Sequence, residues 1–571
     1  MSIYGPVHPL VETGTHNVCA LRPCYLPQMG DPTRFLLGMV KPLVWRVGLD
    51  VRQPGAMWQP EIDELHRREA IAEEMGGKEK VKRHHDNGKL TVRERIASLL
   101  DRDSFHEIGK ISGVASYDDE SGALNSFTPT NFIMGRGKID ARSIVVGGDD
   151  FTVRGGAADA SIWEKQVRAE QMANELRLPI VRLIDGTGGG GSVKTLEMTG
   201  RTYVPANPGW HWVVANMETV PVVSLALGSV AGLGAARTVA SHYSVMVSGL
   251  SQVFVAGPPV VARLGEHVTK EELGGTHIHA RNGVVDDEVD TEEEAFARTR
   301  KFLSYLGSSV HELPPRVAST DDPQRADDWL MNAIPRDRRT VYKVRKIIDA
   351  VVDKDSYFEI GKLWGRSAVT GLARVDGWPV GVLASDPYHY GAGWTADASD
   401  KIIRFVDFCD TFHLPVVHLV DQPGFVIGVG GEKAGTIRHG ARLLSAIYQA
   451  KTPWCSIILR RVYGVAGAGH HPHTNIMFRA AWPSGDWGSL PLEGGIEAAY
   501  KSDLAAAEDP EALLADITKR LNRVRSPFRT AETFEIEEII DPRHTRRHLT
   551  EFANLAAPLR QAGLRHTGMR P

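Results

Sequence analysis

Two glycine-bearing turns are the places in this sequence where residue type and spacing most directly suggest chemistry. Gly232 follows an apolar run that opens at Pro221, and Gly464 follows a similar run that opens at Pro453, at a constant offset of 232 residues. A buried strand that ends at such a turn and restarts as a helix leaves backbone N–H groups unpaired at the start of the helix. Fixed N–H groups can hold an oxygen atom that becomes negatively charged during a reaction. The sequence therefore predicts two copies of one oxyanion-holding device that serve the same reaction.

The elements that position these turns belong to an internal repeat. Four further pairs of segments match in the same order, with offsets that drift through small insertions and deletions. A repeat of this length indicates two homologous domains rather than a solenoid of short units. The matching pairs are residues 92–110 with 344–362, 135–140 with 371–376, 159–161 with 397–399 and 178–185 with 414–421.

Alternating strands and helices within each half predict βαβ units and a largely parallel sheet. Apolar strands are expected at 179–185 and 222–227, and a helix is expected at 162–176. Thr91 and Glu94 have the spacing of a capping box that opens a helix. A stretch rich in Pro and Asp separates the halves. We expect an N-terminal extension (1–56), an N-terminal domain (57–315), a linker (316–335) and a C-terminal domain with a basic tail (336–571).

The charge balance and the cysteine count exclude some classes of function. The 571 residues carry 66 basic and 70 acidic side chains, which argues against a nucleic-acid binder that relies on bulk positive charge. Four cysteines are too few and too scattered for a disulfide framework, and they favour a reducing, cytoplasmic location. Apolar runs fall short of the ~20 residues that a membrane-spanning helix needs, so no membrane partner is expected.

Six short motifs stand out: KLTVRERI (89–96), EELGG (271–275), DQPGF (421–425), IRHGA (437–441), AWP (481–483) and DPR (541–543). With these motifs and its duplicated halves, the chain resembles the carboxyltransferase (β) subunit of biotin-dependent acyl-CoA carboxylases over residues 60–550. That group includes the propionyl-CoA and methylcrotonyl-CoA carboxylases. The resemblance implies an α/β fold of two tandem crotonase-like (ClpP/crotonase) domains related by internal duplication.

The resemblance also implies a reaction. In the family, CO₂ moves from carboxybiotin, held on a separate carrier subunit, to the α- or vinylogous carbon of an acyl-CoA through a thioester enolate. One oxyanion hole holds the enolate, and by position it corresponds to the backbone N–H groups of Gly232 and Leu233. The other holds the biotin ureido oxygen and corresponds to those of Val465 and Ala466. This chemistry implies biotin and a coenzyme A thioester, with no metal in this subunit.

Two loops are expected to line the substrate site after equivalent strands. The loop of the N-terminal half contains Gly188, Gly189 and Gly190, and the loop of the C-terminal half contains Gly424 and Phe425. The first loop lacks the Lys-Ser/Thr of a Walker motif, which argues against nucleotide hydrolysis. Ordinary turn chemistry is the alternative interpretation of both loops.

Both halves depart from the usual family pattern. The common Asp-Ser-Gly-Gly-Ala-Arg appears here as DGTGGG (185–190), and the common Gly-Gly-Ala-Tyr appears as GVAG (464–467). Backbone donors survive both changes, so the chemistry is expected to survive as well. Gly464 and Ala468 are interpreted as substrate-binding residues. Because Ala468 is small, its position permits a longer or branched acyl group.

Other polar residues receive structural interpretations. His470, His471 and His473 have no Asp, Glu or Cys at ligand spacing, so the mouth of the acyl pocket or a surface loop is favoured over a metal site. Asp159 and Asp397, which occupy matching positions in the repeat, are interpreted as helix caps. The two aspartates therefore carry little weight as catalytic residues.

The chain is expected to work with partners. It has no Met-Lys-Met biotinylation motif and no recognisable ATP-binding domain, so a biotin carboxylase and a biotin carboxyl carrier subunit are the expected partners. The resemblance implies a homo-oligomer, a hexamer built as a trimer of dimers or a dimer of trimers, in which opposite halves of neighbouring protomers meet. Two alternatives stay open: a biotin-dependent acyl-CoA decarboxylase subunit of the glutaconyl- or methylmalonyl-CoA type, and a non-catalytic scaffold paralogue in a carboxylase complex.

Overall fold

Among the described residues, two large β-sheets form the centre of the molecule, one in each half of the chain. The computed structural model describes residues 57–156, 162–186, 196–197, 200–202, 204–472, 478–565 and 569, so the predicted N-terminal extension lies outside it. The first sheet has the order β1 (His106–Glu107), β4 (Phe132–Ile139), β5 (Arg142–Asp149), β6 (Ile180–Ile184), β7 (Val222–Ala226), β9 (Tyr243–Val247) and β11 (Asp287–Val289). The second has the order β12 (Phe358–Ile360), β13 (Ala368–Val375), β14 (Trp378–Ser385), β15 (Val416–Gln422), β16 (Trp454–Tyr463), β17 (Phe478–Ala481) and β19 (Glu538–Ile539), with β18 (Asp486–Gly488) also paired to β16.

The two sheets are built in the same way. Each contains an antiparallel hairpin, β4–β5 or β13–β14, and continues as parallel strands. The parallel part begins with Val145 opposite Ile180 in the first sheet and with Gly381 opposite Val416 in the second. Both residues of the second pair lie 236 positions after those of the first. The α/β fold with duplicated halves that the sequence predicts is therefore confirmed.

Left-handed backbone positions repeat between the halves as well. Asp103 and Asp355 both have a φ angle of 57°, and Gly232 and Gly464 have φ angles of 58° and 59°. Residues with a side chain rarely adopt positive φ, so its recurrence at matching positions reflects a common backbone path. The glycines of the two turns that the sequence singles out therefore share a positive φ angle of nearly the same size.

Helices pack against both sheets, with α4 against β4 and β5 and α13 against β13. None of the described helices is both long and apolar enough to cross a membrane.

Smaller strands are β2 (Gly113–Tyr117), β3 (Leu124–Pro129), β8 (Ser229–Ala231) and β10 (Gln252–Phe254). The main helices are α1 (Gln59–Glu73), α2 (Lys78–Asp86), α3 (Val92–Leu99), α4 (Trp163–Leu176), α6 (Trp210–Thr219), α7 (Leu233–Val239), α8 (Pro258–Val261), α9 (Lys270–Gly274), α10 (Thr276–His279), α11 (Glu292–Ser304), α12 (Val344–Val351), α13 (Ala396–Thr411), α14 (Val429–Lys433), α15 (Thr436–Gln449), α16 (Gly464–Ala468), α17 (Leu492–Ala499), α18 (Lys501–Ala506), α19 (Pro510–Val524), α20 (Pro527–Glu532) and α21 (Thr545–Ala556).

The predicted capping box is confirmed at the start of α3. The Thr91 side chain accepts a hydrogen bond from the Glu94 N–H, and the Glu94 carboxylate accepts one from the Thr91 N–H at 2.7 Å. These bonds satisfy two N–H groups that the helix itself leaves without acceptors. The motif that carries the family resemblance therefore has a local structural role.

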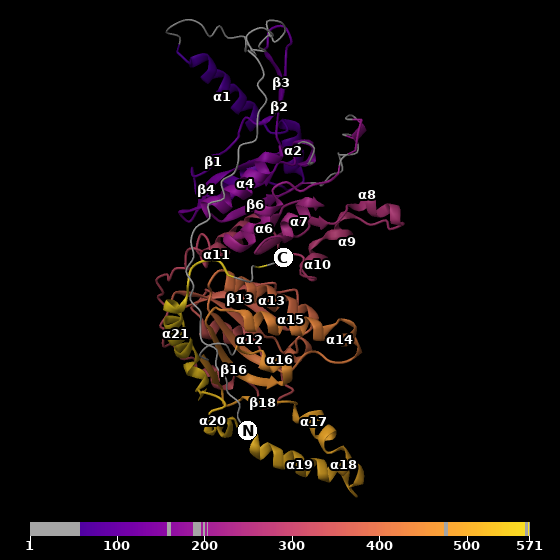
Figure 1. Cartoon of the computed structure of the whole chain (residues 1–571), viewed down its shortest axis with the longest axis vertical. Helices are drawn as coiled ribbons and strands as arrows, with labels where there is room; N and C mark the ends of the chain where they lie inside the picture. The colour runs from indigo at the N-terminus through magenta and orange to yellow at the C-terminus, as the bar shows by residue number, and fades with distance from the viewer. Residues whose placement is uncertain are drawn as a thin grey trace, which may run out of the picture.

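The two halves lie one after the other along the long axis of the molecule, with α1 and the β2–β3 hairpin at one end and α17–α19 at the other (Figure 1). Aromatic rings pack where the halves meet. The Phe302 ring of α11 lies 5.6 Å from that of Phe408 in α13, and the Tyr243 ring lies 5.4 Å from that of Phe358. All four side chains are buried, so the halves share a hydrophobic core. The exact division into domains stays a prediction.

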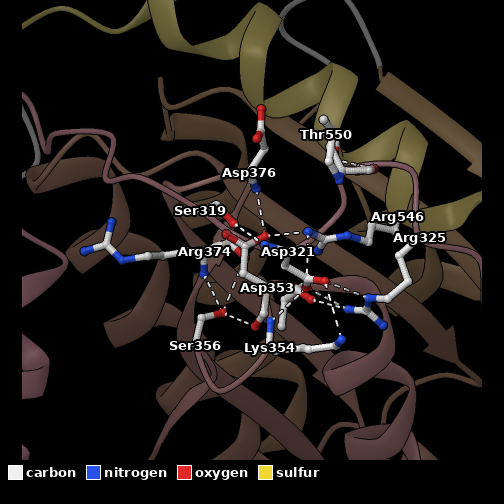
Figure 2. Close-up of polar contacts among 12 residues, drawn as sticks. Ser319, Asp321, Arg325, Asp353, Lys354, Ser356, Arg374, Asp376, Arg546 and Thr550 are labelled. Atoms are coloured by element: carbon white, nitrogen blue, oxygen red, sulfur yellow. Dashed lines mark hydrogen bonds and ion pairs between the residues drawn. The ribbon is translucent and has the colours of Figure 1, made fainter.

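Part of the predicted linker is bound tightly to the C-terminal half (Figure 2). The Asp321 carboxylate accepts two hydrogen bonds from Arg325, both at 3.1 Å, and one from the Lys354 N–H at 3.0 Å. The buried Arg546 of α21 lies 3.3 Å from Asp321 and donates to Asp353 at 2.7 Å. The segment around Asp321 is therefore held in place by the same arginine that attaches α21.

Candidate active site

The second predicted turn begins a short helix at the end of a long strand. Strand β16 ends at Tyr463, and α16 follows without a break. The N–H groups of Val465 and Ala466 lie in the first turn of α16, where the helix offers them no acceptor. The Val465 side chain is 60% exposed, whereas Ala466 is buried. The structure therefore places these N–H groups at a strand-to-helix turn beside an exposed surface.

Trp394 lies between the predicted loop residues Gly424 and Phe425 and the end of α16. Its backbone N–H donates to the Gly424 carbonyl at 3.1 Å, and its ring lies 6.2 Å from the Phe425 ring. On its other side, a Cβ atom added to Gly469, directly after α16, would lie 3.6 Å from the Trp394 ring. The Trp394 ring is fully buried. The loop with Gly424 and Phe425 therefore packs against the end of α16 through Trp394.

A buried carboxylate fixes the start of this loop. Asp421 accepts hydrogen bonds from Arg460 at 2.9 Å, Arg461 at 2.7 Å and the Tyr342 hydroxyl at 3.0 Å. Burial alone would raise the pKa of Asp421, but the two arginines outweigh burial and hold the pKa below its usual value. The end of β15 therefore carries an ionised, fully paired carboxylate, which keeps the following loop in one position.

Two buried donors beside this loop have no acceptor in the described part of the chain. The Gln422 side-chain oxygen accepts from the Gly424 N–H at 2.8 Å, but Gln422 Nε2 is unpaired, and so is Trp394 Nε1. A buried N–H without a partner costs free energy, roughly 1–3 kcal/mol. Donors of this kind mark a place where a ligand oxygen or a water molecule completes the hydrogen bonding.

The first predicted turn begins α7 in the N-terminal half. Leu233 is the first residue of α7, so the helix offers its N–H no acceptor. The N–H of Gly232, in contrast, donates to the Phe254 carbonyl at 3.3 Å and extends the parallel pairing of β8 with β10. At that distance the bond is long for an N–H···O contact. The two turns thus share a glycine with positive φ, but in the first turn the glycine N–H is already bonded to a neighbouring strand.

Asp185 is the counterpart of Asp421 and is also buried among cations. It accepts hydrogen bonds from Lys89 Nζ at 3.1 Å and from Arg95 at 2.9 Å. Arg95 also donates twice to Glu292 of α11, both at 2.8 Å. The KLTVRERI motif therefore supplies the cations that hold the strand end before the glycine-rich loop. Sequence reasoning missed these roles, although the Asp185–Asp421 match in the repeat marks the carboxylates.

Several sequence-based interpretations have a different outcome. Asp397 is not the cap of α13, because Thr395 precedes that helix and accepts from the Ala398 N–H. His470 and His471 are buried directly after α16, so the surface-loop alternative is wrong for these two residues. Within the described ranges, no group of three or more His, Cys, Asp or Glu residues is placed to hold a metal ion. Gly188, Gly189, Gly190, Asp159 and His473 lie outside the described residues.

Comparison with known proteins agrees with this architecture. The family model described as "Carboxyl transferase domain" matches residues 83–563. A propionyl-CoA carboxylase carboxyltransferase subunit of Haloferax mediterranei is 32% identical over 86% of this chain and 94% of that protein. The methylmalonyl-CoA decarboxylase subunit alpha of Veillonella parvula is 31% identical over 86% of this chain and 94% of that protein.

The solved structures extend the comparison. A crystal structure of transcarboxylase 12S, described as a hexamer assembly with methylmalonyl-coenzyme A and methylmalonic acid bound, matches with a TM-score of 0.80. It is 28% identical and covers 91% of this chain and 100% of that chain. Fold and site define an α/β carboxyltransferase with two duplicated halves. The chain belongs to the carboxyl transferase domain family, the family of the carboxyltransferase subunits of biotin-dependent acyl-CoA carboxylases.

Proposed function

We propose that this chain moves CO₂ from carboxybiotin on a separate carrier subunit to the α- or vinylogous carbon of an acyl-CoA. The observation that carries the proposal is the repeated strand-to-helix turn, with Gly232 and Gly464 at φ angles of 58° and 59°, in a chain of this family. Bound carboxybiotin supplies the CO₂, and the coenzyme A thioester supplies the acceptor carbon. Two oxygen atoms gain negative charge in such a transfer, and the chain has one turn for each.

The N-terminal half is proposed to hold the thioester enolate. Leu233 offers a free N–H, and the Gly232 N–H exchanges its long bond with Phe254 for the enolate oxygen. A charged oxygen is the stronger acceptor, which favours this exchange. Each fixed donor in a site without water contributes about 3–4 kcal/mol to the stability of the transition state. Residues 188–190 are proposed to line the same site.

The C-terminal half is proposed to hold the biotin ureido oxygen through the N–H groups of Val465 and Ala466. Gln422 and Trp394 support a ligand at this place, because their buried, unpaired N–H groups face no acceptor among the described residues. The polar oxygens of a carboxylated ureido ring are acceptors of the required kind. Gly424 and Phe425, which contact Trp394, are proposed to form the wall beside them.

The acyl group is proposed to extend past Gly464 and Ala468. Both residues are small and exposed at the two ends of α16, so their side chains leave room for a longer or branched chain. A panel of acyl-CoA substrates with increasing chain length tests this part of the proposal. Turnover of acetyl- and propionyl-CoA alone, with no activity on larger substrates, would contradict it.

The active assembly is proposed to be a hexamer of this chain with a biotin carboxylase and a biotin carboxyl carrier subunit. Apolar side chains are exposed in the loop region after Phe425 and in the second turn: Ile427 is 88%, Val429 73%, Ile437 66% and Val465 60% exposed. Exposed apolar groups of this kind support coverage by a neighbouring protomer. The cytoplasmic location expected from the cysteine content stays a prediction.

Decarboxylation is the second candidate, and the similarity to a methylmalonyl-CoA decarboxylase subunit favours it specifically. Carboxylation and decarboxylation share the same enolate, so the same two turns serve both directions. The partner decides the direction, and purification of the native complex identifies it. An ATP-dependent biotin carboxylase indicates carboxylation, whereas a membrane-bound ion pump indicates decarboxylation.

The reaction itself is tested with the purified complex, MgATP, labelled bicarbonate and a panel of acyl-CoA thioesters. We expect label in the acyl-CoA product only when both the biotin carrier and this chain are present. A complex that carboxylates its biotin but labels none of the thioesters would contradict the proposed function.

The role of the two turns is tested by removing single N–H groups. Leu233→Pro deletes an N–H at the first position of α7, where proline fits a helix well, and Leu233→Ala is the matched control. We expect Leu233→Pro to lower the rate of acyl-CoA carboxylation about 100-fold or more, with a small effect in Leu233→Ala. Val465→Pro and Val465→Ala form the corresponding pair in α16. Equal activity of the Pro and Ala variants would contradict the assigned role.

A further inference from the structure

Asp149 is a buried carboxylate beneath the start of the glycine-rich loop, and the mechanism above does not use it. It is the last residue of β5 and is 8% exposed. Its Oδ2 atom accepts a hydrogen bond from the Asp185 N–H at 3.2 Å. A Cβ atom added to Gly186 would lie 3.0 Å from the same oxygen. Asp149 therefore touches both residues with which the loop begins.

The backbone that Asp149 touches also packs against the turn that is proposed to hold the enolate. A Cβ atom added to Gly234, in the first turn of α7, would lie 3.8 Å from the Gly186 carbonyl oxygen. On the opposite side, a Cβ atom added to Gly156 would lie 2.7 Å from the Asp185 carbonyl oxygen. One backbone segment thus separates the Asp149 carboxylate from the first turn of α7.

The charges around Asp149 leave it without a direct cationic partner. Among the described residues it forms no ion pair, whereas its neighbour Asp185 is paired with Lys89 and Arg95. Arg237 of α7, whose charge opposes the pKa shift of Asp149, is itself paired with Glu170 at 3.3 Å. Burial raises the pKa of Asp149 to about 6, and the Asp185 carboxylate adds to this shift. Arg237, the hydrogen bond from the Asp185 N–H and Arg95 act in the opposite direction and lower the pKa.

The C-terminal half shows that the fold itself does not need this carboxylate. Asp149 corresponds to Ser385 at the end of β14, and the Ser385 hydroxyl is buried without a partner in the described structure. The next residue in each half, Asp150 or Asp386, is in contrast an aspartate with the same structural role in both halves. Asp150 accepts from the Thr152 N–H at 2.9 Å, and Asp386 accepts from the Tyr388 N–H at 3.0 Å. The carboxylate of Asp149 therefore belongs to the N-terminal half alone.

We propose that the negative charge of Asp149 opposes the enolate held in the N-terminal half and that protonation of Asp149 removes that opposition. The proposal rests on the proposed function, because it takes the N-terminal half to hold the enolate. Like charges about 10 Å apart in a protein interior change a rate roughly tenfold at an effective dielectric constant near 20. Loss of the Asp149 proton therefore slows the acyl-CoA step as the pH rises.

The test compares Asp149→Asn with the wild type in the complete complex between pH 5.5 and 8. Asn keeps an oxygen for the Asp185 N–H but does not ionise. We expect the ratio of kcat/KM for acyl-CoA, variant over wild type, to rise from about one at pH 5.5 to about ten at pH 8. Asp149→Ser, which copies Ser385, is expected to follow the same curve. Because a ratio is measured, groups whose pKa is the same in both proteins cancel.

A second readout separates this role from a structural one. Decarboxylation of the carboxylated carrier without acyl-CoA depends on the C-terminal half, so its rate is expected to be equal in variant and wild type at every pH. A kcat/KM ratio that is independent of pH, or below one throughout, would overturn the proposal. A wild-type complex that labels no acyl-CoA at any pH would instead contradict the proposed function.

Discussion

Individual buried carboxylates organise both halves of the site. Asp185 and Asp421 lie at the ends of the equivalent strands β6 and β15, and each is surrounded by cations. The cations come from different places, since Lys89 and Arg95 precede the first sheet whereas Arg460 and its neighbour lie on β16. The repeat therefore preserves the carboxylate but not the source of its partners. Removing one partner of a buried pair leaves an uncompensated charge, which costs about 3–5 kcal/mol.

Asp149→Asn is expected to stabilise the folded protein at pH 8. Burial raises the pKa of Asp149 from 3.8 to about 6, so ionisation at pH 8 destabilises the folded state by about 3 kcal/mol. Because the folded-state pKa is the higher one, this cost decreases as the pH falls through 6 and is roughly halved at pH 5. Calorimetry should therefore give a higher Tm for the variant at pH 8 and a smaller difference at pH 5. A lower Tm at pH 8 would show that the carboxylate stabilises the fold.

Gly228→Ala is expected to break the Asp185 cluster. The added Cβ atom would lie 1.8 Å from Asp185 Oδ1 and 2.4 Å from Lys89 Nζ, so the ion pair must separate. We expect a loss of about 3 kcal/mol or more in the free energy of unfolding. Gly430→Ala is the matched control, because a Cβ atom there meets no atom within 4 Å. Equal thermal stability of the two variants would contradict this account of Gly228.

At the scale of helices and strands, the sequence predicted those features that depend on residues close together in the chain. The capping box at Thr91 and the strands that became β6 and β7 follow from residues a few positions apart. The cap of α13 was misassigned because Asp397 matched the repeat, although Thr395 forms the hydrogen bond. Features that depend on distant partners were missed, such as the Gly232 bond to Phe254 across β8 and β10. Sequence spacing carries no information about which N–H group a neighbouring strand occupies.

Thr91→Ala tests the contribution of the capping box to α3. The variant loses the side-chain acceptor for the Glu94 N–H, which costs about 1 kcal/mol. Hydrogen exchange of the α3 backbone should therefore accelerate about fivefold, measured by mass spectrometry on a peptide that covers residues 91–99. Thr91→Ser keeps the acceptor and should exchange at nearly the wild-type rate. Unchanged exchange in Thr91→Ala would show that tertiary packing alone fixes α3.

At the scale of the whole molecule, the two halves form one body with a shared core and two exposed ends (Figure 1). The Phe302 and Phe408 rings that pack between them are buried, so neither half keeps its packing when separated from the other. The duplicated halves nevertheless present their turns independently, one in α7 and one in α16. If each reaction uses one turn from each of two neighbouring protomers, the assembly rather than the single chain is the catalytic unit.

Complementation between two inactive variants tests this claim most directly. Leu233→Pro impairs the N-terminal turn and Val465→Pro impairs the C-terminal turn, and the two chains are co-expressed and purified as mixed oligomers. Sites that combine the intact halves of neighbouring chains are expected to restore about a quarter of the wild-type carboxylation rate, as random mixing in a symmetric oligomer gives. Each variant alone should remain nearly inactive. Mixed oligomers no more active than the single variants, or single variants as active as the wild type, would contradict the account.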